Sequence, residues 1–404
     1  MSPSPHPDAP LVVIGAGLAG WTTVRELRKL DATRPITLIT ADSGDFYAKP
    51  TLSNALAQKR TPEQLVTTPA ATLAQTLGVT LLAHTRVERV DTTHFTVSFT
   101  GHDVPTTLPY RALVLATGAQ AIRVPLQGDA VSQVLSVNSL QDYSVFHARL
   151  TGVSSSENNS KPKRPSILIM GAGLIGCEFA NDLASAGYRV RVVDPAARAL
   201  AALLPEDTSA QLQTALQDLG IRFDLGQTVI AVNRSESPSG AALRVTLSGG
   251  ESVDADVVLS AIGLHADTAL AQAAGIACER GIVVDAQLQT SAPGVYALGD
   301  SAQYQAAGKR TLPYVMPIMN AARALAATLA GQPTEVKFPL MPVAVKTPAL
   351  PLSIAPPLPG TSGGWQASDA GEWHWLDDTG TLRGFTLAGA ATPRRAKLAA
   401  GVML

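Results

Sequence analysis

The sequence predicts an α/β protein that contains two copies of one strand–helix–strand unit, followed by a small α+β domain. Three observations carry this prediction: short apolar runs that end in glycine, helical spacing after each of them, and a change of composition near residue 335. At 404 residues the chain is too long for one ordinary hydrophobic core, so we expect two or three domains. Hydrophobic residues make up 46% and charged residues 16%, which is typical of a well-buried globular protein.

Each copy of the unit consists of a buried parallel strand, a helix and a second buried strand. The first copy is expected at Leu11–Ile14, Leu18–Leu30 and Ile36–Ile39. The second is expected at Ile167–Met170, Leu174–Ala186 and Val190–Val193. Because the two copies lie far apart in one chain, they indicate an internal duplication rather than a short-period repeat array.

The remaining segments differ in composition and in periodicity. Met1–Pro10 is rich in Pro and Ser and is expected to be a loose lead-in rather than a signal peptide. Thr151–Lys163 has no periodicity and predicts an exposed loop. Thr93–Phe99 and Leu243–Leu247 alternate like antiparallel strands. After residue 335, seven prolines punctuate short apolar runs and three tryptophans follow, which indicates the small α+β domain: Pro339, Pro342, Pro348, Pro351, Pro356, Pro357 and Pro359, then Trp365, Trp373 and Trp375.

Charge, apolar stretches, cysteines and histidines give no indication of several classes of function. The net charge of −1 gives no indication of nucleic acid or an anionic membrane as partner. No apolar stretch approaches the roughly 20 residues of a membrane helix, so we expect no membrane insertion. Cys177 and Cys278 form no CxxC pair, which fits a reducing cytoplasm and removes the redox-active dithiol of many flavoprotein reductases. The seven histidines show no ligand spacing, and we expect no metal site.

Each strand–helix junction carries a glycine fingerprint, Gly15-Ala16-Gly17-Leu18-Ala19-Gly20 in the first copy and Gly171-Ala172-Gly173-Leu174-Ile175-Gly176 in the second. In such a loop the first glycine permits a tight turn, the second lets the backbone approach a pyrophosphate, and the third allows close packing of helix on strand. The phosphates then lie at a helix N-terminus, where free N–H groups favour negative charge. Both copies are therefore predicted to be Rossmann-like dinucleotide-binding domains of three-layer ββα architecture.

The acid that ends the second strand distinguishes the two sites. In the second copy Asp194 stands about 20 residues after the glycines, where its carboxylate accepts hydrogen bonds from ribose hydroxyls and repels a 2′-phosphate. We therefore expect NADH rather than NADPH, and the nearby Arg191 and Arg198 weaken this expectation only slightly. In the first copy the strand ends in Thr40, and the nearest acid is Asp42. Either Asp42 swings back to the ribose, or Thr40 and backbone groups replace it.

With both fingerprints placed, the chain resembles the pyridine nucleotide–disulfide-reductase-like flavoproteins, and among them the rubredoxin–NAD reductases. The resemblance covers almost the whole length. It rests on the two glycine loops and on segments elsewhere in the chain: Tyr47–Ser53, Ala116–Gly118, Gly171–Asn181, Tyr296–Asp300, Tyr314–Pro317 and Met341–Pro348.

The resemblance implies a domain division and two cofactors, FAD and NADH. The FAD-binding domain would comprise residues 1–121 and 263–334, the NAD-binding domain 122–262, and a C-terminal acceptor domain 335–404. The residues assigned to FAD are Gly15, Gly17, Leu18, Ala19, Gly20, Asp42, Lys49, Pro50, Val87, Ala116, Thr117, Gly118, Gly299, Asp300, Pro317 and Lys346. Those assigned to NAD are Gly171, Gly173, Leu174, Ile175, Gly176, Glu178, Asp194 and Gly263.

Among these residues, the resemblance gives Lys49 and Glu178 a catalytic role. Lys49 would lie beside the flavin near N5 with Glu178 as its ion-pair partner, since a buried lysine that stays charged requires a carboxylate. Lys346 would line the other face of the flavin. Asp300 would bind a ribityl hydroxyl or cap a helix. The helix that starts around Met316–Asn320 would point its N-terminal amides at the flavin and stabilise the negative charge of reduction.

The absence of a dithiol decides where the electrons go. Hydride transfer from nicotinamide to flavin needs no general base from the protein, because the cofactors supply the chemistry. Without a cysteine pair, the reduced flavin must pass electrons directly to an outside acceptor. The first hypothesis is an NADH-dependent reductase of rubredoxin or a similar small iron carrier, serving alkane hydroxylation or oxygen detoxification. The alternatives are a ferredoxin reductase that feeds an oxygenase, and a flavin-bound signalling protein whose redox state controls an interaction.

The carrier-docking surface is the least defined part of the prediction. Rubredoxins of the resembled systems are acidic, so the docking surface should be locally basic. Arg394, Arg395 and Lys397 form one candidate cluster, although a solvated surface face explains them as well. We expect a monomer or a weak dimer.

Overall fold

The structure is a computed structural model that describes residues 8–101, 104–154, 164–235 and 241–403. Most of the predicted lead-in Met1–Pro10 lies outside these ranges. The chain divides into two units, which we describe separately. The first unit contains Met1–Ala48, Val66–Gln120 and Leu264–Pro339, and the second contains Lys49–Leu65, Ala121–Gly263 and Leu340–Leu404.

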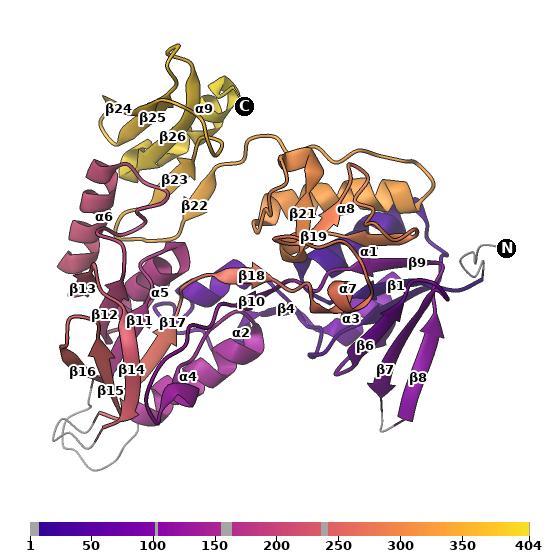
Figure 1. The fold of residues 1–404 in the computed structure, drawn as a ribbon, viewed down its shortest axis with the longest axis horizontal. Helices are drawn as coiled ribbons and strands as arrows, with labels where there is room; N and C mark the ends of the chain where they lie inside the picture. The colour runs from indigo at the N-terminus through magenta and orange to yellow at the C-terminus, as the bar shows by residue number, and fades with distance from the viewer. Residues whose placement is uncertain (1–7, 102–103, 155–163, 236–240, 404) are drawn as a thin grey trace. The chain divides into compact units, whose positions relative to one another are not determined.

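A five-stranded parallel sheet forms the centre of the first unit (Figure 1). Its strand order is β20-β9-β1-β2-β5, with β1 at Leu11–Ile14, β2 at Ile36–Ile39, β5 at Thr80–Leu82, β9 at Ala112–Leu115 and β20 at Val295–Ala297. Every residue of β1 and β2 is buried, which explains their continuous apolar sequence. The helices of this unit are α1 (Leu18–Leu30), α3 (Ala70–Leu77), α7 (Ala269–Ala273) and α8 (Val315–Leu329).

Smaller sheets complete the first unit. An antiparallel sheet contains β6 (Arg86–Asp91), β7 (Thr96–Gly101) and β8 (Val104–Pro109). The two-stranded pairs are β3 (Phe46–Tyr47) with β4 (Val66–Thr68), β10 (Ala119–Ala121) with β18 (Leu264–Ala266), and β19 (Ile282–Val284) with β21 (Ala302–Tyr304). Two 3₁₀ turns, η3 (Gly299–Ser301) and η4 (Gln305–Ala307), flank β21.

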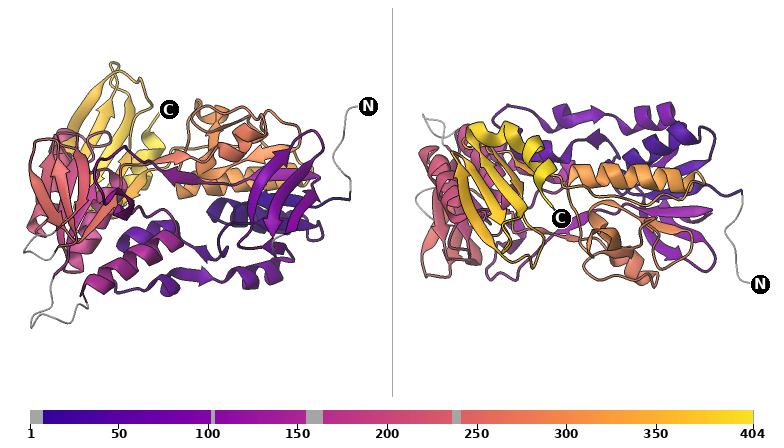
Figure 2. Two further views of the ribbon diagram at one scale, coloured as in Figure 1. Left: turned by 60° about the horizontal axis from the view of Figure 1, so that its bottom comes forward. Right: turned by 90° about the horizontal axis from the view of Figure 1, so that it is seen from above.

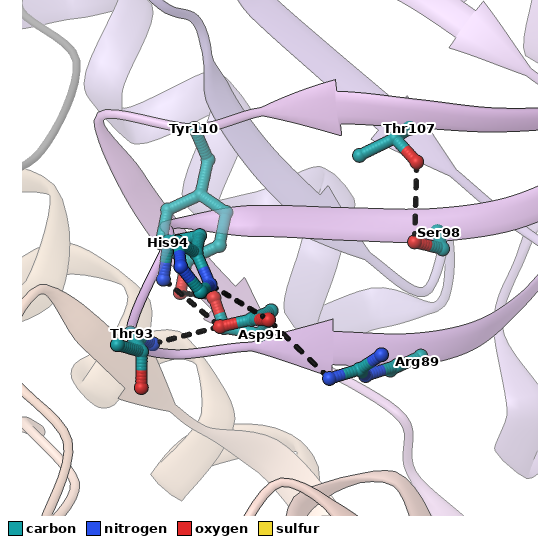
Figure 3. A network of polar contacts seen from close by, with 7 residues as sticks. All are labelled: Arg89, Asp91, Thr93, His94, Ser98, Thr107 and Tyr110. Atoms are coloured by element: carbon teal, nitrogen blue, oxygen red, sulfur yellow. Dashed lines mark hydrogen bonds and ion pairs between the residues drawn. The ribbon is translucent and has the colours of Figure 1, made fainter.

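The turn between β6 and β7 is held by one carboxylate (Figure 3). Asp91 accepts hydrogen bonds from the backbone N–H groups of Thr93 and His94 at 3.0 and 2.9 Å, and its other oxygen contacts the His94 ring and Arg89. These bonds, above all those from His94, lower the pKa of Asp91 to about 2. We predicted a strand over Thr93–Phe99, but its first residues form this turn and β7 begins only at Thr96.

The second unit also has a parallel sheet at its centre, with four strands. Its order is β13-β12-β11-β17, with β11 at Ser166–Met170, β12 at Arg189–Asp194, β13 at Arg222–Leu225 and β17 at Val257–Ser260. The accompanying helices are α4 (Leu140–Ser154), α5 (Leu174–Ser185) and α6 (Glu206–Asp218). An antiparallel sheet contains β14 (Val229–Arg234), β15 (Leu243–Leu247) and β16 (Ser252–Ala255). Helix α4 continues through Ser154, so the loop predicted over Thr151–Lys163 was wrong for its first four residues. Residues 155–163 of that prediction lie outside the described ranges.

A five-stranded antiparallel sheet lies near the end of the chain, in the region where the sequence predicted a small α+β domain. Its order is β22-β23-β26-β25-β24, with β22 at Val343–Val345, β23 at Leu352–Ala355, β24 at Gly364–Asp369, β25 at Glu372–Leu376 and β26 at Leu382–Ala388. The 3₁₀ segment η5 (Gly389–Arg394) leads into α9 (Arg395–Gly401), which lies beside this sheet (Figure 2). Phe385 and Leu387 form a small core with side chains of α9.

Three short segments complete the second unit: η1 (Lys49–Asn54), α2 (Pro62–Leu65) and η2 (Val131–Gln133). Segment η1 contacts α5. Within the described ranges, no helix combines the length and apolar character needed to cross a membrane.

Candidate dinucleotide sites and a buried charge cluster

The first glycine loop joins β1 to α1, and its three glycines have three different surroundings. Gly15 has a φ of +108°, and a Cβ there would lie 2.2 Å from the carbonyl oxygen of Ala116. A Cβ on Gly20 would lie 1.9 Å from the carbonyl oxygen of Gly15. A Cβ on Gly17 would meet nothing within 4 Å. The outer two glycines therefore serve the turn and the helix packing, whereas the middle one leaves space on its open side.

The second glycine loop, between β11 and α5, repeats this geometry. Gly171 has a φ of +107°, and its Cβ would lie 2.6 Å from the carbonyl oxygen of Ala261. A Cβ on Gly176 would lie 2.0 Å from the carbonyl oxygen of Gly171, and one on Gly173 would meet nothing. In both loops the middle glycine is the helix N-cap, with no side-chain cap and no acid in the first turn. A pyrophosphate fits both places, because the backbone is accessible there and the N-terminal N–H groups favour an anion.

Asp194 lies against the second loop. At the end of β12, its two carboxylate oxygens accept hydrogen bonds from the backbone N–H groups of Ala172 at 2.6 Å and Ala196 at 2.7 Å. Asp194 therefore lies beside the middle of the glycine loop, and its contact with a ribose stays a prediction.

The two arginines near Asp194 are engaged by other groups. Arg191 forms ion pairs with Asp224 and Glu251, and the Arg198 guanidinium donates to the backbone carbonyl of Leu204 at 2.8 Å. Their sequence proximity to Asp194 thus does not place a free cation beside the ribose position. This arrangement favours a nucleotide without a 2′-phosphate.

The acid near the first loop is held differently. Thr40, which follows β2, donates its hydroxyl to Asp42 at 2.6 Å, and the N–H of Gly44 donates to the same oxygen at 3.0 Å. Thr40 itself is buried, whereas Asp42 is exposed. The structure therefore links the two residues that the sequence offered as alternatives, and the ribose contact of Asp42 stays a prediction.

Segments far apart in sequence meet at the first glycine loop, all within the first unit. The Ala116 carbonyl faces Gly15, and a Cβ on Gly299 would lie 2.9 Å from the Ala19 side chain. The N–H of Gly299 donates to the hydroxyl of the fully buried Tyr304 at 2.8 Å, which fixes the segment before Asp300. The Thr117 hydroxyl donates to the Asp267 carbonyl at 2.8 Å, and Gly118 has a φ of +76°.

The structure also places the other residues assigned to the cofactors on particular elements. Pro317 is buried in the first turn of α8, a helix that packs against α1, and Val87 is a partly buried residue of β6. Gly263 has a φ of +112° and accepts a hydrogen bond from the Ile122 N–H at 3.0 Å. Lys49 and Pro50 open η1.

Glu178 forms its ion pair with another lysine than the one predicted from the sequence. Glu178 in α5 is fully buried, and its carboxylate contacts the Lys346 ammonium rather than Lys49. It also accepts the Lys346 backbone N–H at 2.9 Å and the Ser53 hydroxyl at 2.6 Å. The expected Lys49–Glu178 ion pair was therefore wrong. The reason is that the segment after β22 contacts α5 through Lys346 and Ala349, which a motif comparison of η1 alone does not reveal. We call Ser53, Glu178 and Lys346 the buried charge cluster.

Helix α5 presents two more buried polar side chains that the sequence interpretation missed. Asn181 accepts the Ala349 N–H at 3.0 Å, and Asp182 accepts the N–H groups of Leu56 and Ala57, both at 2.9 Å. The helix that begins at the second glycine loop therefore binds the backbone N–H groups of two other segments, at Leu56 and Ala57 and at Lys346 and Ala349. The available signal was the i, i+3, i+4 spacing of Glu178, Asn181 and Asp182 on an otherwise apolar helix.

Both cysteines are free, and Cys177 is a packing residue. Its thiol is fully buried and lies 3.4 Å from the Ala172 carbonyl oxygen, and burial raises its pKa to about 12. A thiol with this pKa is a poor nucleophile. Within the described ranges no group of three or more His, Cys, Asp or Glu side chains could hold a metal ion.

The basic cluster suggested for carrier docking is smaller than expected. Arg394 forms ion pairs with Asp369 at 2.7 Å and with Glu372 at 3.0 Å, so its charge is locally compensated. Arg395 and Lys397, on α9, are exposed. Of the three residues in the suggested cluster, Arg395 and Lys397 are thus the better candidates for contact with an acidic carrier.

Two glycine loops at helix N-termini, the second with Asp194 beside it, are typical of α/β oxidoreductases that bind two dinucleotides. The chain belongs to the pyridine nucleotide-disulphide oxidoreductase family, which matches residues 9–327. Residues 335–402 match the rubredoxin binding C-terminal domain. These matches confirm the resemblance, the fold class and the enzyme class predicted from the sequence, and FAD and NADH are the cofactors that this family uses.

Known proteins similar to this chain have names that agree with the family. A rubredoxin-NAD(+) reductase from Alcanivorax borkumensis is 41% identical over 392 residues, which is 96% of this chain and 97% of the relative. A nitric oxide reductase FlRd-NAD(+) reductase from Vibrio vulnificus is 41% identical over 334 residues, which is 83% of this chain and 82% of the relative. Among solved structures, a ferredoxin reductase from Rhodopseudomonas palustris superimposes with a TM-score of 0.83 at 25% identity and covers 98% of this chain and 95% of its own.

Proposed function

We propose that this protein oxidises NADH with a bound FAD and passes the electrons one at a time to rubredoxin. The observation that carries the proposal is the combination of two dinucleotide loops with a C-terminal domain of the rubredoxin binding family. Bound FAD supplies the chemistry, since it accepts hydride from NADH and releases electrons to an iron carrier. With Cys177 buried and no disulfide formed, the protein offers no thiol relay between flavin and carrier.

Each part of the chain has one task in this proposal. Residues 1–121 and 263–334 bind FAD, residues 122–262 bind NADH, and residues 335–404 bind the carrier. The open faces of Gly17 and Gly173 receive the pyrophosphates, and Asp194 selects the ribose of NADH. Glu178 and Lys346 place a fixed charge pair at the redox site, with Lys49 near the flavin. We also propose a cytoplasmic location, consistent with two free cysteines.

The family names leave the downstream reaction open. One similar protein is named for rubredoxin and another for FlRd. The relative from Alcanivorax borkumensis, which is named for rubredoxin, aligns with this chain over 97% of its own length. We propose that the carrier delivers electrons to alkane hydroxylation or to oxygen detoxification.

The carrier contact can be tested by charge reversal on α9. Lys397→Glu should slow rubredoxin reduction about threefold to tenfold at low ionic strength, and the difference should shrink as salt screens the charges. Lys309→Glu carries the same charge change at an exposed position of the other unit and should behave like the unchanged protein. An identical salt dependence for all three proteins would remove α9 from the docking surface.

A further inference from the structure

A hollow of about 500 Å³ lies along helix α1 in the first unit. Its walls come from α1, β3, α3 and α8, and α1 contacts each of the other three elements. This volume is within the range of about 300–1,000 Å³ that is typical of small-molecule pockets. We call it the α1 hollow; among the residues that line it are Leu18, Thr22, Arg25, Phe46, Leu77 and Met319.

The α1 hollow extends away from the first glycine loop. Of its lining residues, Leu18 alone is also assigned to FAD, and it stands in the first turn of α1. Arg28 lines the hollow as well, and it follows Leu18 by ten residues, which is roughly 15 Å along a helix. A pyrophosphate at the N-terminus of α1 therefore leaves the rest of the hollow to another molecule.

The wall of the α1 hollow is mainly apolar. Leu18, Phe46 and Leu77 are partly buried side chains that pack against the core of the first unit. Met319 adds a thioether from α8. Apolar surface that remains accessible favours contact with hydrocarbon, because the contact removes both surfaces from water. A ligand of this hollow should therefore have an apolar body.

Thr22 places a buried hydroxyl in this wall. The residue is only 3% exposed, and its hydroxyl donates to the Met319 sulfur at 3.8 Å. A thioether sulfur is a weak acceptor. The neighbouring Thr23 donates instead to the Ala19 carbonyl at 2.8 Å, a bond that helical threonines commonly form with the preceding turn. Within the described ranges the Thr22 hydroxyl thus lacks a strong acceptor, and an oxygen atom of a ligand can supply one.

Arg25 places a cation in the same wall, about one turn after Thr22. Its guanidinium carbon lies 4.2 Å from the centre of the Phe46 ring, so the charge is held against an apolar surface. Arg25 forms no ion pair with any residue that the structure describes. The guanidinium N–H groups are therefore available to an anion in the hollow.

The other charged side chains of the α1 hollow are already engaged. Arg28 donates to two backbone carbonyls at the end of α3, at 2.6 and 3.0 Å. Lys29 and Glu26 form an ion pair at 2.7 Å, so their charges compensate each other. Arg25 is thus the charge that a bound anion would balance.

We propose that the α1 hollow binds a carboxylate with an apolar tail, of the size of a medium-chain fatty acid. The Arg25 guanidinium has the planar fork that pairs with a carboxylate, and the Thr22 hydroxyl donates to the same group. The apolar side chains of the wall contact the tail. This site takes no part in the electron transfer proposed above, and it adds a second kind of ligand to the first unit.

The test is isothermal titration calorimetry of the FAD-loaded protein with octanoate, below the concentration at which octanoate forms micelles. We expect one saturable site for each chain, and a thermal midpoint that rises with octanoate because a ligand of the folded state stabilises it. Each methylene removed from the tail should weaken binding about twofold to fourfold. Octanol, which lacks the charge, and inorganic phosphate, which lacks the tail, should each bind at least about tenfold more weakly.

Variants of the two polar residues locate the binding site. Arg25→Gln should weaken octanoate binding about tenfold to hundredfold, and Arg25→Lys, which keeps the charge without the fork, should lie between. Thr22→Val removes the hydroxyl with little change of shape and should weaken binding about threefold to tenfold. Arg111→Gln carries the same charge change at an exposed position of the first unit outside the hollow, and it should bind octanoate like the unchanged protein.

The flavin absorbance and the thermal midpoint without octanoate show whether each variant is folded, and Arg25→Lys stands in for Arg25→Gln if that variant does not fold. The absence of saturable octanoate binding would overturn the proposal, and so would equally tight binding of octanol or phosphate. Octanoate binding that is unchanged in both Arg25→Gln and Thr22→Val would place the ligand elsewhere and refute the site. None of these outcomes depends on NADH oxidation, so the proposed function stands or falls separately.

Discussion

Replacing Gly173 with alanine tests the second dinucleotide site, because the structure separates its effect on folding from its effect on binding. Gly173 has φ and ψ of −76° and −172°, which alanine adopts without strain, and the added Cβ meets nothing within 4 Å. A glycine-to-alanine change at such a position stabilises a protein by about 0.4–1 kcal/mol through the unfolded chain. Gly173 is also the N-cap of α5, where alanine is less favourable than glycine, so the two effects oppose each other and the thermal midpoint of Gly173→Ala should stay close to that of the unchanged protein.

The affinity for NADH, by contrast, should fall. The Cβ occupies the open side of the loop, where the backbone must approach the pyrophosphate. Loss of that approach should cost about 1.4–2.8 kcal/mol, which is about a tenfold to hundredfold weaker affinity for NADH. The FAD site, which belongs to the other glycine loop, should keep its full flavin content.

Gly176→Ala is the matched control for folding. Its Cβ would lie 2.0 Å from the Gly171 carbonyl oxygen, so the backbone must shift, and such overpacking costs about 1–3 kcal/mol. The two variants should therefore separate: Gly173→Ala loses affinity and Gly176→Ala loses stability. Anaerobic NADH titration of the flavin absorbance, combined with thermal unfolding, measures both. An unchanged NADH affinity in Gly173→Ala at full flavin content would refute the assignment of the loop.

Two further predictions concern carboxylates. Asp194→Ala removes the carboxylate that accepts the Ala172 and Ala196 amides. The preference for NADH over NADPH, measured as the ratio of the two kcat/KM values, should then fall about tenfold to hundredfold. An unchanged ratio would show that the ribose lies elsewhere. Asp91, whose pKa is lowered to about 2 by its bonds to His94, contributes stability that is present above its usual pKa near 4 and is lost as pH falls toward 2. The thermal midpoint of Asp91→Asn should therefore lie below that of the unchanged protein at pH 7, and the gap should close between pH 4 and pH 2; a gap that persists at pH 2 contradicts the charge-based account.

Local patterns in the sequence predicted the dinucleotide units closely. The strands at Leu11–Ile14 and Ile36–Ile39 and the helix at Leu18–Leu30 have the expected bounds, because buried parallel strands and an amphipathic helix are encoded by neighbouring residues. The position of Asp194 followed in the same way from its spacing to the glycines. These features depend on contacts within one strand–helix–strand unit, which short-range periodicity describes well.

The buried charge cluster could not be predicted in this way. Its members stand at positions 53, 178 and 346, and the partner of Glu178 depends on which distant segment passes over α5. The family resemblance assigned Lys49 to Glu178 as its partner, whereas the carboxylate contacts Lys346. Likewise, Arg394 looked like part of a basic cluster in sequence, and only the fold of the C-terminal sheet brings Asp369 and Glu372 against it.

The most direct test of the account is a double-mixing stopped-flow measurement. The FAD-loaded protein is first reduced with NADH under anaerobic conditions and is then mixed separately with rubredoxin, a [2Fe–2S] ferredoxin or dissolved oxygen. We predict that NADH reduces the flavin rapidly and that rubredoxin reoxidises it much faster than ferredoxin or oxygen does. Fast reoxidation by oxygen alone, or very slow reduction by NADH with a long-lived complex of the two cofactors, would contradict an electron-transfer role toward rubredoxin.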